Sequence, residues 1–117
     1  MRILRVVPLI ILGSALLGAF QSPYLVGNGV SAPVAIYTPE PGYTPEAKDA
    51  RVEGEVWLGV VIDENGVPSD VSVKQSLEPS LDQRAVETIR NWRFKPGMKD
   101  GSPVAVQATI SVHFKLL

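Results

Sequence analysis

Few residues of this 117-residue chain could take part in catalysis, and the strongest candidates are the neighbouring acids Asp63 and Glu64. Two carboxylates can act as a general acid and a general base when their surroundings separate their pKa values. Here the acids are followed directly by Asn65 and Gly66, and this combination is typical of a solvent-exposed hairpin turn. We therefore interpret both acids as turn residues and predict that the protein is not an enzyme.

Metal ligands and nucleophiles are equally scarce. His113 is the single histidine and the chain has no cysteine, which excludes two-histidine metal sites, zinc–thiolate sites and thiol chemistry. The sequence also contains no glycine-rich phosphate loop and no nucleophile elbow. We therefore expect neither a cofactor nor a metal. His113 is interpreted as a surface residue, with contact to a partner as the alternative.

Two further features allow both a structural and a functional interpretation. Trp57 falls on the face of a predicted strand opposite to the core pattern, where it packs under the N-terminal segment or contacts a partner. A basic cluster follows the second predicted helix, where it would balance the helix dipole or hold an anion. Its members are Arg90, Arg93, Lys95 and Lys99. The net charge of −1 gives no reason to expect a nucleic-acid partner.

The most regular pattern lies at the end of the chain, from Val104 to Leu116, where every second residue is apolar. The alternation predicts a strand with one apolar face and one polar face. This strand would be about twice the usual length, and no proline or glycine interrupts it. Because little of the chain remains to cover it, we expect it at or near a sheet edge. Its unpaired backbone groups could there pair with another chain.

Two segments precede the region of regular patterns. Residues 1–20 combine two arginines with an apolar run from Val6 to Phe20, which spans about 22 Å as a helix. This is typical of a cleaved signal peptide, with an uncleaved membrane anchor over residues 6–20 as the alternative, and both place the remainder outside the cytoplasm. Residues 21–42 are rich in proline and glycine and are predicted to be a linker with a reach of at most about 70 Å.

The remaining sequence predicts the order helix, strand, strand, helix, strand. Thr44 is expected to cap a short helix that ends near Gly54, and residues 55–62 and 67–75 are expected to form a hairpin. The second helix is expected to begin with a capping box at Ser80 and to stop at Pro96. A right-handed crossover then places the last strand beside the first. We predict an α+β fold, with two helices on one face of a three-stranded antiparallel or mixed sheet of order 2-1-3.

Five stretches of the sequence resemble the TonB C-terminal domain family, in family order and at family spacing. They are Tyr43–Ala47, Arg51–Val56, Asp63–Val67, Ala85-Val86 and Trp92–Pro96. The resemblance covers about Pro41 to Leu117 and indicates a TonB C-terminal-like domain over residues 43–117. One departure is Thr44, which stands between Tyr43 and Pro45 where the family has tyrosine directly before proline.

The resemblance implies a periplasmic adaptor that binds a peptide segment of an outer-membrane transporter by strand addition beside its last strand. Carried onto this sequence, the partner-binding residues are Arg93, Ala105, Val106, Gln107, Ala108, Thr109 and Ile110. An inner-membrane motor complex is an expected partner only if residues 1–20 remain uncleaved. The short linker, and an apolar segment without the family's histidine, both depart from the energy-coupling members. The alternative is an envelope module without energy transduction, which forms a homodimer through the same edge or binds the cell wall.

Overall fold

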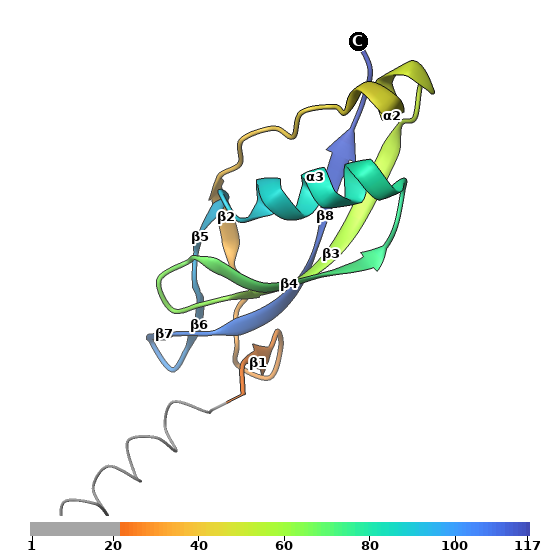
Figure 1. Cartoon of the computed structure of the whole chain (residues 1–117). Coiled ribbons are helices and arrows are strands. Elements are labelled where there is room, and N and C mark those ends of the chain that lie inside the picture. Colours follow the sequence, from red (N-terminus) through yellow and green to blue (C-terminus); the bar gives the residue numbers. More distant parts are fainter. Residues whose placement is uncertain (1–21) are drawn as a thin grey trace, which may run out of the picture.

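A four-stranded sheet, in the order β1-β8-β3-β4, organises the computed structural model, which describes residues 22–117 (Figure 1). The elements are β1 (Tyr24–Leu25), β2 (Val34–Tyr37), α2 (Pro45–Asp49), β3 (Gly54–Ile62), β4 (Pro68–Gln75), α3 (Pro79–Ile89), β5 (Arg93–Lys95), β6 (Gly97–Lys99), β7 (Ser102–Val104) and β8 (Val106–Phe114). The predicted signal peptide or anchor lies outside the described residues. Within residues 22–117, no helix has the length and apolar character needed to cross a membrane.

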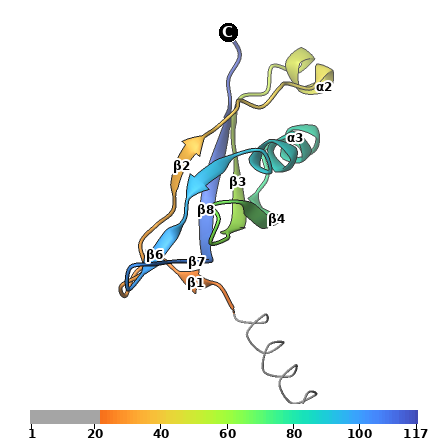
Figure 2. The same cartoon turned by 90° about the vertical axis from the view of Figure 1, so that its left-hand side faces the viewer.

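The sheet confirms the predicted fold class and strand order. Strand β3 pairs antiparallel with β4 on one side and with β8 on the other, and this is the predicted order 2-1-3. Strand β1 adds a short parallel pairing to β8, which makes the sheet mixed. Both helices lie on one side of the sheet (Figure 2). The predicted α+β fold is therefore the observed one.

The core lies between the sheet and the two helices, and it uses the side chains that the alternation of β3 predicts. Its largest members are fully buried, as expected where an amphipathic helix covers one face of a sheet. Burial of each large aliphatic side chain contributes roughly 1.5–3 kcal/mol. The buried set includes Val56, Leu58, Val60 and Ile62 of β3, Leu81, Ala85 and Ile89 of α3, and Val112 and Phe114 of β8.

The start of α3 differs from the prediction. Glu78, not Ser80, is the N-cap, and its carboxylate accepts hydrogen bonds from the backbone N–H groups of Ser80 and Leu81. The hydrogen bond that the Ser80 hydroxyl donates lowers the pKa of Glu78, and the backbone hydrogen bonds act in the same direction. Ser80 instead meets the hydroxyl of Thr44 at 2.6 Å and so joins the two helices.

The end of α3 also differs, because the helix stops at Ile89 rather than at Pro96. The residues that follow form β5, which pairs with β2 from a distant part of the chain. Arg93 Nη1 donates to the carbonyl oxygens of Arg90 (2.9 Å) and Trp92 (2.6 Å), where the chain leaves the helix. A tertiary pairing therefore overrides the helical pattern that continues toward Pro96.

The other local predictions are confirmed in part. Thr44 is the N-cap of α2 and accepts a hydrogen bond from the Ala47 N–H at 3.2 Å, as predicted. Helix α2 ends at Asp49, before Gly54, and Arg51 then has a positive φ of 55°. In the hairpin after β3 only Gly66 has a positive φ (79°), so the turn is not the type in which both central residues are left-handed.

The predicted strand from Val104 to Leu116 is broken at Ala105. Strand β7 ends at Val104 and pairs with β6, whereas β8 begins at Val106 and pairs with β3. Val104, the first residue of the predicted strand, therefore belongs to a different sheet from β8, and the chain bends between them. The alternation continues through this bend, so it could not indicate where the strand would break.

The described part of the predicted linker, residues 22–42, packs against the domain. Strand β1 pairs with β8, and β2 pairs with β5. Between them Gly27 and Val30 exchange two backbone hydrogen bonds, and Val30 is buried. The prolines keep this segment out of central strands, but they leave room for short pairings at the edges. Its use as a spacer stays a prediction.

Candidate functional site

The last strand, β8, has one side paired to β3 and the other side mostly open. On the open side β1 covers only Val106 and Gln107, and the Tyr24 N–H donates to the Ala105 carbonyl oxygen at 2.9 Å. The chain then turns back at Gly27. Among residues 22–117, no strand pairs with this side of β8 from residue 108 to residue 114. We call these seven residues the free flank.

The backbone direction shows which groups the free flank offers. Along a strand, successive residues point their N–H and C=O groups to opposite sides. Because the Ala105 carbonyl points toward β1, the odd-numbered residues Thr109, Ser111 and His113 direct their N–H and C=O groups into the free flank. The even-numbered residues between them direct theirs to β3. The flank thus offers three residues whose donors and acceptors suit pairing with an added strand.

A groove of about 470 Å³ lies along the outer half of this flank. One wall is formed by β8 and the residues after it, from Ser111 to Lys115, and the other wall is formed by residues 38–41. Tyr43 and Trp92 close the groove between the walls. Its lining mixes apolar side chains with the charged groups of Glu40 and Lys115, which suits a peptide better than a purely apolar ligand.

Two aromatic side chains hold the groove in shape. The indole Nε1–H of Trp92 donates to the Pro39 carbonyl oxygen at 3.0 Å, which fixes residues 38–41 to the end of α3. The Tyr43 hydroxyl donates to the Val52 carbonyl oxygen at 2.8 Å, and its ring meets that of Phe114 edge to face at 5.8 Å. Desolvation raises the pKa of Tyr43, and the nearby charge of Glu53 raises it further.

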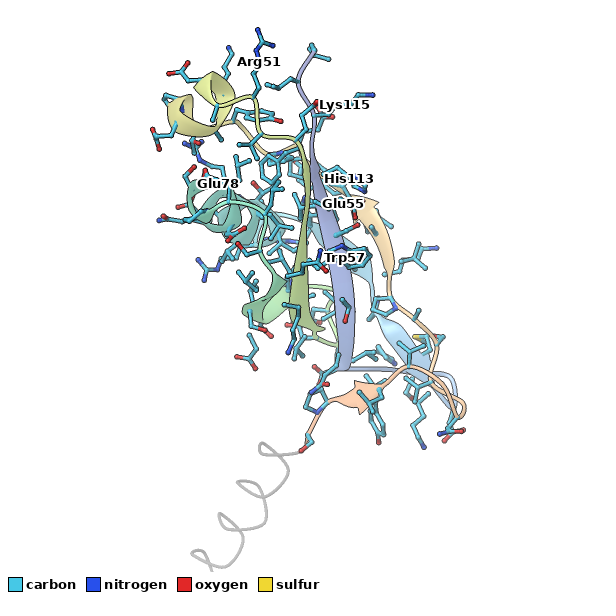
Figure 3. All side chains as sticks on the ribbon, turned by 90° about the vertical axis from the view of Figure 1, so that its right-hand side faces the viewer. Arg51, Glu55, Trp57, Glu78, His113 and Lys115 are labelled. Atoms are coloured by element: carbon cyan, nitrogen blue, oxygen red, sulfur yellow. The ribbon has the colours of Figure 1, made fainter. Side chains whose placement is uncertain are left out.

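The face of the sheet away from the helices carries a row of side chains beside the same flank. Glu55 is the register partner of His113, with Oε1 and Nδ1 3.9 Å apart, and Trp57 is the register partner of Ser111. In Figure 3 the side chains of Glu55, Trp57 and His113 project on the side of the sheet away from α3. A strand added at the free flank would place alternate side chains next to this row.

The structure brings only some of the predicted binding residues to the open part of the edge. Ala108, Thr109 and Ile110 lie on the free flank, whereas β1 covers Val106 and Gln107. The Ala105 carbonyl is already bonded to Tyr24. Arg93 lies in β5, where its guanidinium bonds the carbonyls at the end of α3, and it does not line the groove.

The binding residues carried over from the resemblance do not include the outer half of the groove. Ser111, His113 and Lys115 do belong to the run that the alternation predicts as an edge strand, and partner contact is one of the two interpretations given for His113. Trp92 helps to close the groove through its hydrogen bond to the Pro39 carbonyl oxygen, so its role there depends on where residues 38–41 pack. No local pattern indicates that packing.

The acidic pair is part of a turn, as predicted. The Asp63 carboxylate accepts hydrogen bonds from the backbone N–H groups of Asn65 and Val67, each at 2.9 Å, and so stabilises the hairpin between β3 and β4. Glu64 is exposed. Within residues 22–117, no three His, Asp or Glu side chains come together as a metal site would require.

Comparisons with known proteins agree with this fold. Residues 39–116 match the family described as the Gram-negative bacterial TonB protein C-terminal, and the chain belongs to that family. The chain is 39% identical over 77 residues to protein TonB of Xanthomonas campestris pv. campestris, and the match covers 65% of this chain and 34% of that protein. It is 36% identical over 106 residues to protein TonB of Vibrio cholerae serotype O1, and this match covers 85% of this chain and 40% of that protein.

The matches therefore span well under half the length of these two relatives. Among solved structures, the chain resembles the solution NMR structure of the Pseudomonas aeruginosa TonB CTD, with a TM-score of 0.57 and 26% sequence identity. That match covers 82% of this chain and 96% of the solved chain. The resemblance to the TonB C-terminal domain that the sequence indicates is thus confirmed.

Proposed function

We propose that this protein is a periplasmic adaptor whose C-terminal domain binds an extended peptide of an outer-membrane transporter by strand addition at the free flank of β8. The observation that carries the proposal is the outer side of β8 beyond Gln107, which pairs with no strand among residues 22–117 and lies next to a groove with space for a peptide. Backbone hydrogen bonds would supply affinity, and the alternate side chains of the peptide would supply selectivity. Membership of the TonB C-terminal family supports a binding role rather than a catalytic one.

The covered start of β8 defines one end of the proposed site. Because β1 occupies the positions beside Val106 and Gln107, we place the peptide beside Ala108 to His113. Ala108, Thr109 and Ile110 belong to the expected binding run, and Ser111 and His113 extend it toward the groove. We do not place Arg93 in the peptide site, because its guanidinium already donates hydrogen bonds to the carbonyl oxygens at the end of α3.

Coupling to an inner-membrane motor is a separate step of the proposal. It requires residues 6–20 to remain as an anchor, so that a force generated in the inner membrane could reach the domain. N-terminal sequencing of the exported protein tests this step. An intact Met1 or a retained apolar run supports coupling, whereas a mature protein that begins near Gln21 leaves a periplasmic binding module without a tether.

An NMR titration tests peptide binding by the full chain in detergent micelles. The ligands are short peptides from the periplasm-facing segments of outer-membrane transporters. We expect the largest amide shifts at Thr109, Ser111 and His113. Shifts confined to the outer edge of β4 or to β2 would show that the peptide binds there and not at β8. The absence of shifts with every peptide would also reject strand addition at β8.

A further inference from the structure

We propose that Trp57 and Ser111 form a side-chain site that selects a bulky apolar residue in the added strand. This inference rests on the proposed function, because it needs a strand at the free flank. The two residues are register partners on β3 and β8. Their neighbours Val56, Leu58 and Val112 are buried on the helix side, so alternation places Trp57 and Ser111 on the face of the sheet away from the helices. In this proposal Trp57 contacts a side chain of the peptide, whereas strand addition at β8 by itself involves only backbone hydrogen bonds.

The size difference between the two side chains makes contact with the peptide feasible. An added strand would lie two strand spacings from β3, or about 10 Å, which is beyond the reach of most side chains. Ser111 is small and leaves the space above β8 open to the tryptophan side chain, which projects on this face (Figure 3). The groove also borders Ser111, so space for a ligand side chain lies beside it. The peptide residue opposite Ser111 would therefore meet the indole ring.

The neighbours of Trp57 restrict the apolar contact to one peptide position. On one side the next rung holds the polar pair of Glu55 and His113. On the other side the next rung holds Gly59, over which the Lys74 side chain lies so closely that an added Cβ would be 2.5 Å from its Cε. Trp57 is thus one apolar side chain between two polar rungs. Because pairs of aromatic and aliphatic side chains across strands are favourable, the peptide position beside Trp57 should prefer an apolar residue.

Synthetic peptides of alternating valine and threonine, with a lysine at each end, provide the probe for the test. One peptide carries leucine at the position opposite Ser111 and a second carries alanine, the position being identified from nuclear Overhauser contacts. Affinities are measured by NMR titration of the full chain in detergent micelles, for the wild type, Trp57→Ala and Val61→Ala. Val61 is the matched control, because it lies on the same strand and face but is paired with the covered Gln107.

The ratio of the two affinities is the informative quantity, since a general weakening of the sheet would change both affinities equally. We expect the wild type and Val61→Ala to bind the leucine peptide about tenfold more tightly than the alanine peptide. In Trp57→Ala we expect this ratio to fall to about twofold or less. An unchanged ratio in Trp57→Ala would overturn the side-chain site while peptide binding itself stands. If neither peptide shifts Thr109, Ser111 or His113 in the wild type, the proposed function and this inference both fail.

Discussion

The backbone N–H of Tyr24 donates to the carbonyl oxygen of Ala105 at 2.9 Å, and this hydrogen bond marks where the N-terminal segment begins to follow β8. The pairing lasts for two residues, and the segment is then held by the turn at Gly27 and by the buried side chain of Val30. The edge of β8 is therefore divided into a covered start and the free flank. Partner peptides would meet β1 at this boundary.

Replacing Tyr24 with proline should extend the binding footprint toward the start of β8. Proline has no N–H to donate to Ala105, so β1 is expected to detach and to expose Val106 and Gln107. The footprint is the set of amides shifted by a bound peptide in NMR spectra. Tyr24→Phe is the matched control, because it keeps the N–H and the ring near Lys99. A footprint that already includes Gln107 in the wild type would show that peptides displace β1.

Ser111→Pro should weaken peptide binding much more than Ser111→Ala does. Proline removes the N–H that Ser111 directs into the free flank but leaves the ladder to β3 in place, whereas alanine keeps the N–H. Loss of a central backbone hydrogen bond should raise the Kd about tenfold. Titration calorimetry gives the two affinities. Equal affinities for the proline and alanine variants would contradict backbone pairing at this position.

We expect the substitution Gly66→Ala, in the turn after β3, to destabilise the fold strongly. A Cβ there would lie 1.8 Å from the Phe94 carbonyl oxygen, and the residue has a φ of 79°. Gly66→Ala should lower the free energy of unfolding by about 3 kcal/mol. Gly101→Ala is the control, because Gly101 has the same φ of 79° but open space around it, and it should cost about 1 kcal/mol. Urea unfolding measures both, and equal losses would show that the contact with Phe94 is unimportant.

Because Glu78 is the N-cap of α3, we expect the folding stability of the domain to depend on pH. Hydrogen bonds lower the pKa of Glu78 in the folded state, so its contribution is present above the unfolded pKa of about 4.3 and is lost as the pH falls through the lower, folded value. The stability difference between the wild type and Glu78→Gln should therefore be larger at pH 6 than at pH 3. Urea unfolding at the two pH values tests this. A difference that grows on acidification would contradict the assignment of Glu78 as the cap.

Patterns of period two and of helical spacing were enough to predict the three long strands of the main sheet and the core, but not β1. In the sequence, apolar residues alternate from Val56 to Ile62 and recur at helical spacing at Leu81, Ala85 and Ile89, and the structure buries these side chains. These patterns succeed because each element must bury one continuous face. The predicted order of β4, β3 and β8 followed from the connections between them.

The remaining features depend on pairings between distant segments, which local patterns do not record. The end of α3 at Ile89 follows from the pairing of β5 with β2. By residue type Ser80 is the favoured N-cap, whereas the structure uses Glu78, whose carboxylate reaches two N–H groups. Proline and glycine in residues 22–42 indicate what the segment cannot form, but not that it packs along the domain and builds one wall of the groove.

Amide hydrogen exchange, residue by residue along β8 with and without a transporter peptide, tests the central claim most directly. In the free protein the amides of Ala108, Ile110 and Val112 should exchange slowly, because they are directed to β3, and those of Thr109, Ser111 and His113 should exchange fast. Peptide should slow the second set and leave the first set unchanged. Slow exchange of Thr109, Ser111 and His113 in the free protein, or fast exchange that persists with saturating peptide, would contradict strand addition at the free flank.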